Sequence, residues 1–146
     1  MAFKKILVAL DFSEPSARAL RLAHELAKAA GAQLEVVHVH PELYDGRGNA
    51  ELGLPWPNAG QEERYLRFLV QEIRGAIDNT VGPTVEAHIE VTHGDPVKRV
   101  LAMVEQRDAD LLCVGSTGKG GVQRALLGSV SQSLLRSSPV PVLVVH

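Results

Sequence analysis

Short apolar runs alternate with helix-patterned segments along the chain, and this alternation limits the fold more than any other feature. The apolar run from Lys5 to Leu10 ends at Asp11, as a strand buried on both faces would. The next segment, Ser13 to Ala30, repeats apolar residues at helical spacing, opens with a cap-like Ser-Glu-Pro and stops at Gly31. Repeated strand and helix units predict an α/β protein, a parallel sheet with helices on both faces.

The same alternation continues to the C-terminus. Five strands of this kind fit the order 3-2-1-4-5, and ligands of such sheets bind where the strand order reverses, outside the carboxyl ends of strands one and four. Asp11 ends strand one and Gly115 ends strand four, so both are expected at this point. The further strands are expected at Leu34 to His40, Val85 to Thr92, Leu111 to Val114 and Val140 to Val145, and the further helices at Gln61 to Thr80, Asp95 to Arg107 and Gly128 to Ser137.

Size and composition are those of one ordinary globular domain over residues 1–146, with 45% hydrophobic and 22% charged residues. A net charge of -2, with no basic cluster interleaved with aromatics, argues against a nucleic-acid partner. The apolar run behind Lys4 and Lys5 is too short to span a membrane, so we expect no membrane partner and a cytoplasmic location. Cys113 is the single cysteine and is expected to be an inert core thiol.

A glycine and hydroxyl segment, residues 115–129, lies between the fourth strand and the last helix. Glycines let backbone N–H groups approach an anion, and the first turn of the following helix adds unpaired N–H donors and the positive end of its dipole. The hydroxyls of Ser116, Thr117 and Ser129 are further donors. The segment therefore predicts a phosphate site, although a glycine loop that binds nothing is the alternative.

Two well-known phosphate loops do not fit this segment. A Walker loop that ended at Gly118 and Lys119 would need a glycine where Cys113 stands and a hydroxyl where Gly120 stands. The dinucleotide pattern G-x-G-x-x-G is absent here and after the first strand. What remains is Gly115, two residues, Gly118, nine residues and then Gly128 with Ser129.

At these residues the chain resembles the universal stress protein family, whose nucleotide-binding branch carries G-x2-G-x9-G-[ST] between the fourth strand and the last helix. The resemblance extends to the first strand through Asp11, to Val37-His38-Val39, and to the closing Pro139 to Val145. It covers essentially the whole chain and is weakest between residues 42 and 80.

This resemblance implies the same strand order, an adenine-nucleotide-hydrolase-like fold, and ATP with Mg²⁺ or Mn²⁺ as ligand. It implies that Asp11 contacts the ribose or the cation, although a helix-cap or turn role for Asp11 stays open. Lys119 and Arg124 are candidates to neutralise phosphate charge, or else belong to a solvated surface. The residues implied at the adenine are Ala9, Leu10 and Val39, and those at the phosphates are Gly115, Gly118, Gly128, Ser129 and the Val130 backbone.

The final strand predicts a dimer. An apolar edge strand left bare promotes aggregation, and pairing with its own copy across a two-fold axis would cover it. The resemblance implies such antiparallel pairing through Val140 to Val145, where Pro141 fits an edge.

Two further features leave alternatives open. The segment from Pro41 to Gly60 has little periodicity and is expected to be an irregular loop, with Trp56 between two prolines, either a lid over the nucleotide or a flap that is mobile or packs on the partner. His38 and His40 share one strand face and form either a metal-binding pair or a core pair without function.

The chain lacks a G-x-S-x-G elbow, an H-E-x-x-H motif and a cysteine pair. We therefore expect no catalytic residues, and a regulatory ATP-binding dimer with at most slow hydrolysis or phosphoryl transfer to a hydroxyl such as Ser129. The alternatives are an interaction module of the same fold that binds no nucleotide and a genuine ATPase or phosphotransferase.

Overall fold

The computed structural model describes residues 2–41, 43–44, 50–52, 59–117 and 127–146. A five-stranded sheet forms its centre, in the order β5-β2-β1-β6-β7, and every neighbouring pair in it is parallel. This is the predicted order 3-2-1-4-5, which is confirmed. The strands are β1 (Lys5–Ala9), β2 (Gln33–Pro41), β5 (His88–Gly94), β6 (Leu111–Gly115) and β7 (Val142–Val145).

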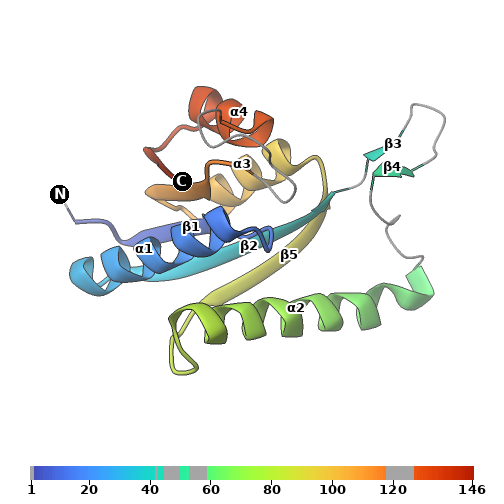
Figure 1. The fold of residues 1–146 in the computed structure, drawn as a ribbon, viewed down its shortest axis with the longest axis horizontal. Coiled ribbons are helices and arrows are strands. Elements are labelled where there is room, and N and C mark those ends of the chain that lie inside the picture. The colour runs from blue at the N-terminus through green and yellow to red at the C-terminus, as the bar shows by residue number, and fades with distance from the viewer. Residues whose placement is uncertain (1, 42, 45–49, 53–58, 118–126) are drawn as a thin grey trace.

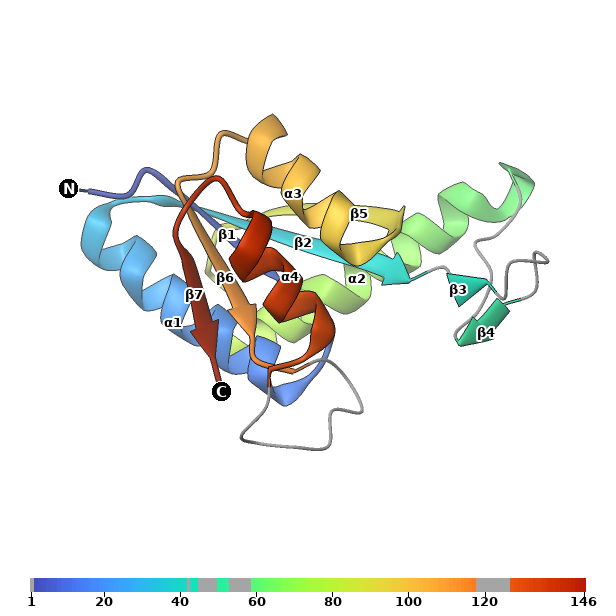
Figure 2. The same ribbon diagram turned by 90° about the horizontal axis from the view of Figure 1, so that it is seen from above.

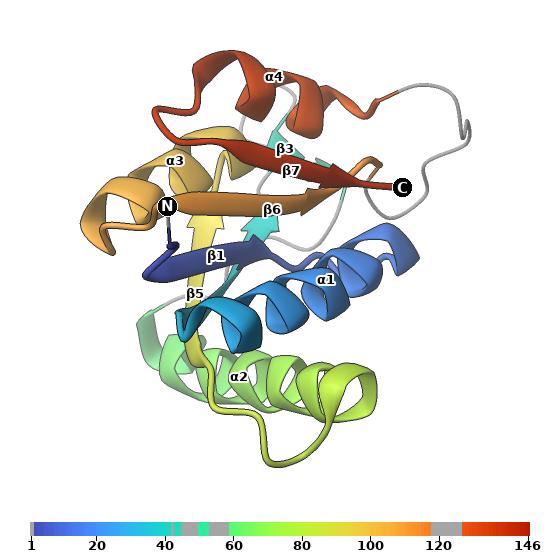
Figure 3. The same cartoon turned by 90° about the vertical axis from the view of Figure 1, so that its left-hand side faces the viewer.

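Four helices in the described parts of the chain cover the sheet, as predicted: α1 (Glu14–Ala30), α2 (Ala59–Val81), α3 (Pro96–Gln106) and α4 (Ser129–Ser137). Helices α1 and α2 lie on one face and α3 and α4 on the other (Figures 1 and 3). Each face has its own apolar core, because successive residues of a buried strand point to opposite faces. Ile6 and Val8 join the core under α1 and α2, whereas Leu7 joins the core under α3 and α4.

The helix ends follow the sequence signals. The Ser13 side chain caps α1 by accepting a hydrogen bond from Ser16 N at 3.2 Å, and Asp95 caps α3 by accepting one from Val97 N at 3.0 Å. Gly31 ends α1 with φ of 66°, a left-handed conformation that glycine adopts without strain. These caps fix where α1 and α3 begin, and both beginnings lie at the carboxyl edge of the sheet.

The expectation of an irregular loop from Pro41 to Gly60 was wrong in part. Strand β2 extends through Pro41, α2 begins at Ala59, and β3 (Leu43–Tyr44) pairs antiparallel with β4 (Ala50–Leu52). This small pair lies beyond the carboxyl end of β2, apart from the main sheet (Figures 1 and 2). Pairs of two and three residues are too short for a period-two pattern to stand out in the sequence. Trp56, and with it the lid or flap, lies outside the described residues.

Two strands begin later than predicted, and side chains bond backbone groups just ahead of each. The Val85 carbonyl accepts a hydrogen bond from Arg74 Nη2 at 2.7 Å, and β5 begins only at His88. At Val140, the carbonyl accepts from Ser138 Oγ at 2.8 Å and the N–H donates to the same oxygen at 3.2 Å. Pro141 has no N–H, so β7 begins at Val142. Along this strand Val142 and Val144 pack on one core and Leu143 and Val145 on the other.

The topology brings distant segments to one edge. Strands β1 and β6 are neighbours, and the helices that come after them, α1 and α4, lie on opposite faces of the sheet (Figures 2 and 3). The carboxyl ends of β1 and β6 therefore flank the crevice that the sequence pointed to. Among the described helices, none has the length and apolar character needed to cross a membrane.

Candidate functional site

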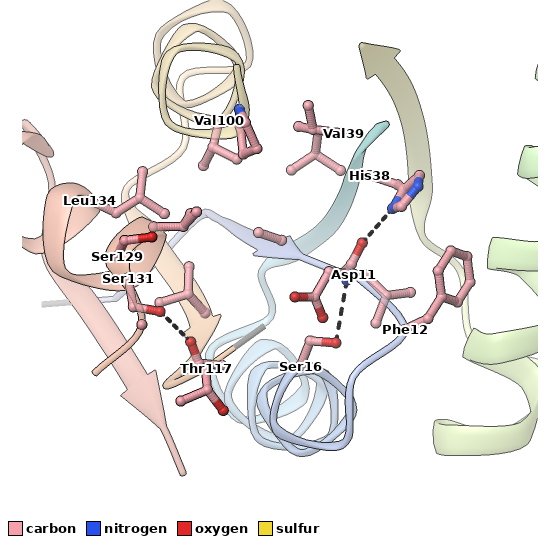
Figure 4. A pocket seen from close by; sticks show the side chains of 18 residues that line it. Asp11, Phe12, Ser16, His38, Val39, Val100, Thr117, Ser129, Ser131 and Leu134 are labelled. Atoms are coloured by element: carbon pink, nitrogen blue, oxygen red, sulfur yellow. Dashed lines mark hydrogen bonds between the residues drawn. The ribbon is translucent and has the colours of Figure 1, made fainter. Parts of the chain in front are cut away.

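A cavity of about 620 Å³ lies at the carboxyl ends of β1, β2 and β6 (Figure 4). Its floor comes from the strand ends, and its walls come from the first turn of α1 and the first two turns of α3 and α4. Its size is within the range of small-molecule sites, and such sites are typically apolar with a few polar groups that converge. The lining residues are Ala9, Leu10, Asp11, Phe12, Ser16, Val37, His38, Val39, Pro96, Val100, Val114, Gly115, Thr117, Gly128, Ser129, Val130, Ser131 and Leu134.

Asp11 is fixed by the turn that joins β1 to α1. Its Oδ1 accepts hydrogen bonds from the Ser13 N–H, at 3.0 Å, and from the Ser13 hydroxyl, while its own N–H donates to Ser16 Oγ at 3.3 Å. The Ser16 hydroxyl in turn donates to the Ser13 carbonyl at 2.9 Å. The turn role proposed as an alternative for Asp11 is therefore real. It occupies Oδ1, and Asp11 still lines the cavity.

The N-terminus of α4 opens onto the same cavity. Gly128 occupies the cap position without a side-chain cap, and the helix begins with Ser129 and Val130, both exposed. The first N–H groups of an α-helix have no carbonyl partner within the helix, and they form the positive end of its dipole. Ser129, Val130 and Ser131 all line the cavity, so this end of α4 is suited to a negatively charged group.

Gly115 is required for a reason the sequence did not show. A Cβ on Gly115 would lie 2.7 Å from Ser16 N and 2.8 Å from the Pro15 carbonyl carbon, inside the backbone of α1. Glycine at this position lets the first turn of α1 pack directly on the end of β6. The Gly115 carbonyl also accepts a hydrogen bond from the buried Ser131 hydroxyl at 2.6 Å, which ties β6 to α4.

The structure brings together most of the residues predicted from the sequence. Ser116 is the exception among the described ones: it is buried, its N–H donates to the Val145 carbonyl at 2.8 Å, and its carbonyl accepts from Gly128 N at 2.7 Å. It is a structural link between β7 and α4 and does not line the cavity. Gly118, Lys119 and Arg124 lie outside the described residues. Those that do line the cavity are Ala9, Leu10, Asp11, Val39, Gly115, Gly128, Ser129 and Val130.

Other lining residues were not identified from the sequence. Pro96 and Val100 stand four apart at the start of α3, which leaves the sheet at its carboxyl edge, so the strand–helix alternation already held a signal for them. No sequence pattern marked Phe12 as a lining residue. It adopts φ of 65°, which is uncommon for a bulky residue. His38, expected either to bind a metal with His40 or to lie in the core without function, borders the cavity.

The described residues do not form a protein metal cage. They contain no group of three or more His, Cys, Asp or Glu placed to hold an ion. His38 Nδ1 lies 2.8 Å from the Leu10 carbonyl and His40 Nδ1 lies 3.2 Å from the Tyr65 hydroxyl, so these two histidines do not converge on one point. Mg²⁺ is commonly held by one or two carboxylates together with phosphates and water, and Asp11 fits that arrangement.

Burial shifts the pKa of two side chains, Cys113 and His38. The Cys113 thiol has no exposed surface, and desolvation raises its pKa to about 12, so it stays a protonated core thiol. Burial also lowers the pKa of His38, against the opposing effects of the Leu10 hydrogen bond and the Asp11 charge. Asp11 is the one carboxylate among the described residues that line the cavity.

Comparison with known proteins assigns the family. The model of the universal stress protein family matches residues 2–146. The chain belongs to the universal stress protein family. It is 33% identical over 144 residues to a universal stress protein of Thermus aquaticus, which covers 99% of each chain. It is also 31% identical over 147 residues to one of Methanocaldococcus jannaschii, which covers 98% of this chain and 82% of the relative.

Solved structures of the family share the fold. A universal stress protein from Lactobacillus plantarum aligns with a TM-score of 0.72 over 100% of this chain and 99% of its own, at 18% identity. A universal stress protein solved in complex with cAMP aligns with a TM-score of 0.67 over 100% of this chain and 98% of its own, at 25% identity. The five-stranded parallel sheet is therefore the family's fold.

Proposed function

We propose that this universal stress protein binds an adenine nucleotide in the cavity at the carboxyl ends of β1 and β6. The observation that carries the proposal is the placement of Asp11 and the open N-terminus of α4 in one cavity. The α4 terminus would receive phosphate, Asp11 a ribose hydroxyl or the cation, and Val39 with Leu10 the base. A family member solved with cAMP supports this class of ligand.

The ligand proposed is ATP with Mg²⁺ or Mn²⁺. Asp11 would hold the cation through the carboxylate oxygen that Ser13 does not occupy, and the bound cation would supply positive charge beside the phosphates. Lys119 and Arg124, beyond the described residues, remain candidates for the same task.

A thermal melt with and without nucleotide tests binding directly. A ligand at about 100 times its dissociation constant adds roughly 2.7 kcal/mol to the free energy of unfolding, so Mg-ATP, AMP and cAMP are each compared with buffer. We expect an upward shift of the melting temperature with at least one of them. No shift with any nucleotide at millimolar concentration would contradict the proposal and favour an interaction module without a ligand.

A charge placed at the start of α4 locates the phosphate end. Ser129→Asp puts a carboxylate at the positive end of the helix dipole, which favours the helix by about 0.3–1 kcal/mol but repels phosphate. We expect intact folding and weaker binding of ATP. The matched control is Gln132→Glu, which adds the same charge one turn later at an exposed position that does not line the cavity. Equal affinities for the two variants would remove α4 from the site.

We expect at most slow hydrolysis or phosphoryl transfer. Near the start of α4 the described lining consists of hydroxyl, glycine and apolar residues, so it offers no base to position an attacking water. A single-turnover assay with labelled ATP distinguishes slow hydrolysis, rapid hydrolysis and phosphoryl transfer to the protein. Rapid release of phosphate would favour a genuine ATPase, and a labelled protein band would favour transfer to a hydroxyl such as Ser129.

We also propose a homodimer through Val140 to Val145. Strand β7 is the edge of the sheet, and the Pro141 and Val145 carbonyls point toward β6. Because backbone groups alternate along a strand, the Val144 N–H points away from β6 toward the open edge. Val144→Pro removes that donor while an edge strand tolerates the ring. We expect a dimer for the unaltered chain and a folded monomer for the variant in sedimentation velocity.

A further inference from the structure

His38 lies where the base end of the cavity meets the turn that carries Asp11. It is on β2, directly before Val39, and 7% of its surface is exposed. Val39 belongs to the core under α3 and α4, so the alternation along the strand turns His38 to the other face of the sheet. There it borders the cavity beside the β1–α1 turn, and its ring nitrogen is directed at that turn (Figure 4).

The hydrogen bond to the turn defines the state of the imidazole. His38 Nδ1 lies 2.8 Å from the Leu10 carbonyl oxygen. A carbonyl oxygen only accepts, so Nδ1 carries a proton and donates it. Because desolvation by burial lowers the pKa of His38, the neutral form with its proton on Nδ1 prevails at neutral pH.

The turn itself is held at several points. The Leu10 N–H donates to the Val37 carbonyl at 2.9 Å, and Asp11 is bonded to Ser13 and Ser16. Phe12 follows in the left-handed region, with φ of 65°, a strained conformation that persists only where the surroundings fix it. The Phe12 ring packs on the His38 ring, with 4.9 Å between centroids and 59° between planes. His38 therefore contacts the residue on each side of Asp11.

We propose that His38 is a positioning residue for the nucleotide site: by holding the Leu10 carbonyl and the Phe12 ring, it aims the Asp11 carboxylate into the cavity. The inference rests on the proposed function, since it assigns the Asp11 carboxylate a ligand to meet. His38 acts through its neighbours, so its loss changes affinity by letting the turn relax. The role is distinct from the phosphate contacts of α4 on the far side of the cavity.

Two substitutions separate the hydrogen bond from the volume of the side chain. His38→Leu fills similar space without a donor. His38→Asn carries an amide N–H donor bonded to Cγ, which is the position that Nδ1 has in histidine. The matched control is His40→Leu. His40 is on the same face of β2, is 8% exposed, and has its Nδ1 3.2 Å from the Tyr65 hydroxyl instead of the Asp11 turn.

Titration calorimetry with AMP and with Mg-ATP, beside a melting temperature for each variant, is the test. We expect the dissociation constant to rise on the order of tenfold in His38→Leu and to return close to the unaltered value in His38→Asn. His40→Leu lowers the melting temperature but leaves the affinity unchanged. Unchanged affinity in His38→Leu, or an equal loss in His40→Leu, overturns the positioning role and leaves nucleotide binding standing.

A second measurement does not depend on any ligand. Nitrogen-15 spectra of the histidine side chains in the unliganded protein are expected to show His38 protonated at Nδ1 and bare at Nε2 near neutral pH. The opposite tautomer overturns the inference whatever the protein binds. If the unaltered chain binds neither AMP nor ATP, the proposed function fails, and the positioning role fails with it.

Discussion

The two ends of the parallel sheet use polar groups in opposite ways. At the amino end, Asp110 accepts hydrogen bonds from Lys4 N and Lys5 N at 2.8 and 3.2 Å. Glu35, 3% exposed, is held by two hydrogen bonds from Arg107, both of 3.1 Å. At the carboxyl end, Asp11 has one oxygen bonded within the turn, and α4 begins with an exposed Ser129. At the amino end the polar groups bond one another, whereas at the carboxyl end polar groups face a cavity.

This difference separates stability from function within one sheet. A buried polar group without a partner destabilises a fold by about 1–3 kcal/mol, so the amino end, which only has to be stable, pairs its groups internally. The carboxyl end keeps donors and a carboxylate oxygen available and confines the internal bonds to those that hold Asp11 in place. Substitutions at the amino end should therefore change stability alone, and substitutions at the carboxyl end should change both stability and binding.

Gly115→Ala is expected to have the largest effect, because the added methyl group forces α1 away from the end of β6. The added methyl would lie 2.7 Å from Ser16 N, and helix backbone has no rotamer with which to yield. We expect a loss of about 2–3 kcal/mol in the free energy of unfolding, together with weaker nucleotide binding, as α1 shifts away from β6. Urea unfolding and calorimetry measure the two effects.

The control for this substitution is Gly75→Ala in the middle of α2. A Cβ there meets no heavy atom within 4 Å, and alanine favours a helix interior over glycine by about 0.8–1 kcal/mol. We expect a gain in stability and no change in affinity. Should Gly115→Ala be as harmless as Gly75→Ala, the close packing of α1 on β6 would not be what Gly115 provides.

The second test disrupts the internal hydrogen bonds at the amino end of the sheet. Arg107→Leu leaves the Glu35 carboxylate buried without its guanidinium partner, and the free energy of unfolding should fall. The loss should be smaller than for Gly115→Ala, since 33% of the Arg107 side chain is exposed and water reaches the gap. Replacing both residues by leucine should recover most of it. Nucleotide affinity should not change in either variant, and a change would mean that the two ends are not independent.

The sequence was sufficient for most of the fold, because the main strands are apolar runs or, for β5, an alternation of apolar and polar residues, and because α1 and α3 carry their own caps. Ser13 and Asp95 act where the pattern placed them. The late starts of β5 and β7 were not predicted; ahead of these strands the Arg74 and Ser138 side chains bond the Val85 and Val140 backbones. Such side-chain bonds are invisible to periodicity, which reads only the apolar spacing.

The candidate site divides in the same way. Asp11, Gly128 and Ser129 were found from the sequence because each follows a strand or opens a helix, and topology then brings them to one edge. The roles of Gly115 and His38 depend on contacts with other elements, α1 in one case and the β1–α1 turn in the other. A contact between segments more than twenty residues apart leaves no local pattern.

The smallest expected effect is a pH dependence of stability at the carboxyl end. The pKa of His38 in the folded chain lies below its ordinary 6.5, chiefly because burial disfavours the charged ring. Well above pH 6.5 the ring is neutral in both states. As the pH falls through that value the unfolded chain takes up the proton first, so stability falls until the pH passes below the folded pKa. His38→Asn should remove this part of the slope.

Because every other ionisable group is the same in both proteins, the difference between their two stability curves, measured by urea unfolding from pH 8 to about 5, isolates His38. The curves should run parallel above neutrality and converge or cross on the acid side, since only the unaltered chain loses this contribution. Curves that stay parallel throughout would mean that the folded chain does not hold His38 neutral, and that the bond from Nδ1 to the Leu10 carbonyl is made as readily by the charged ring.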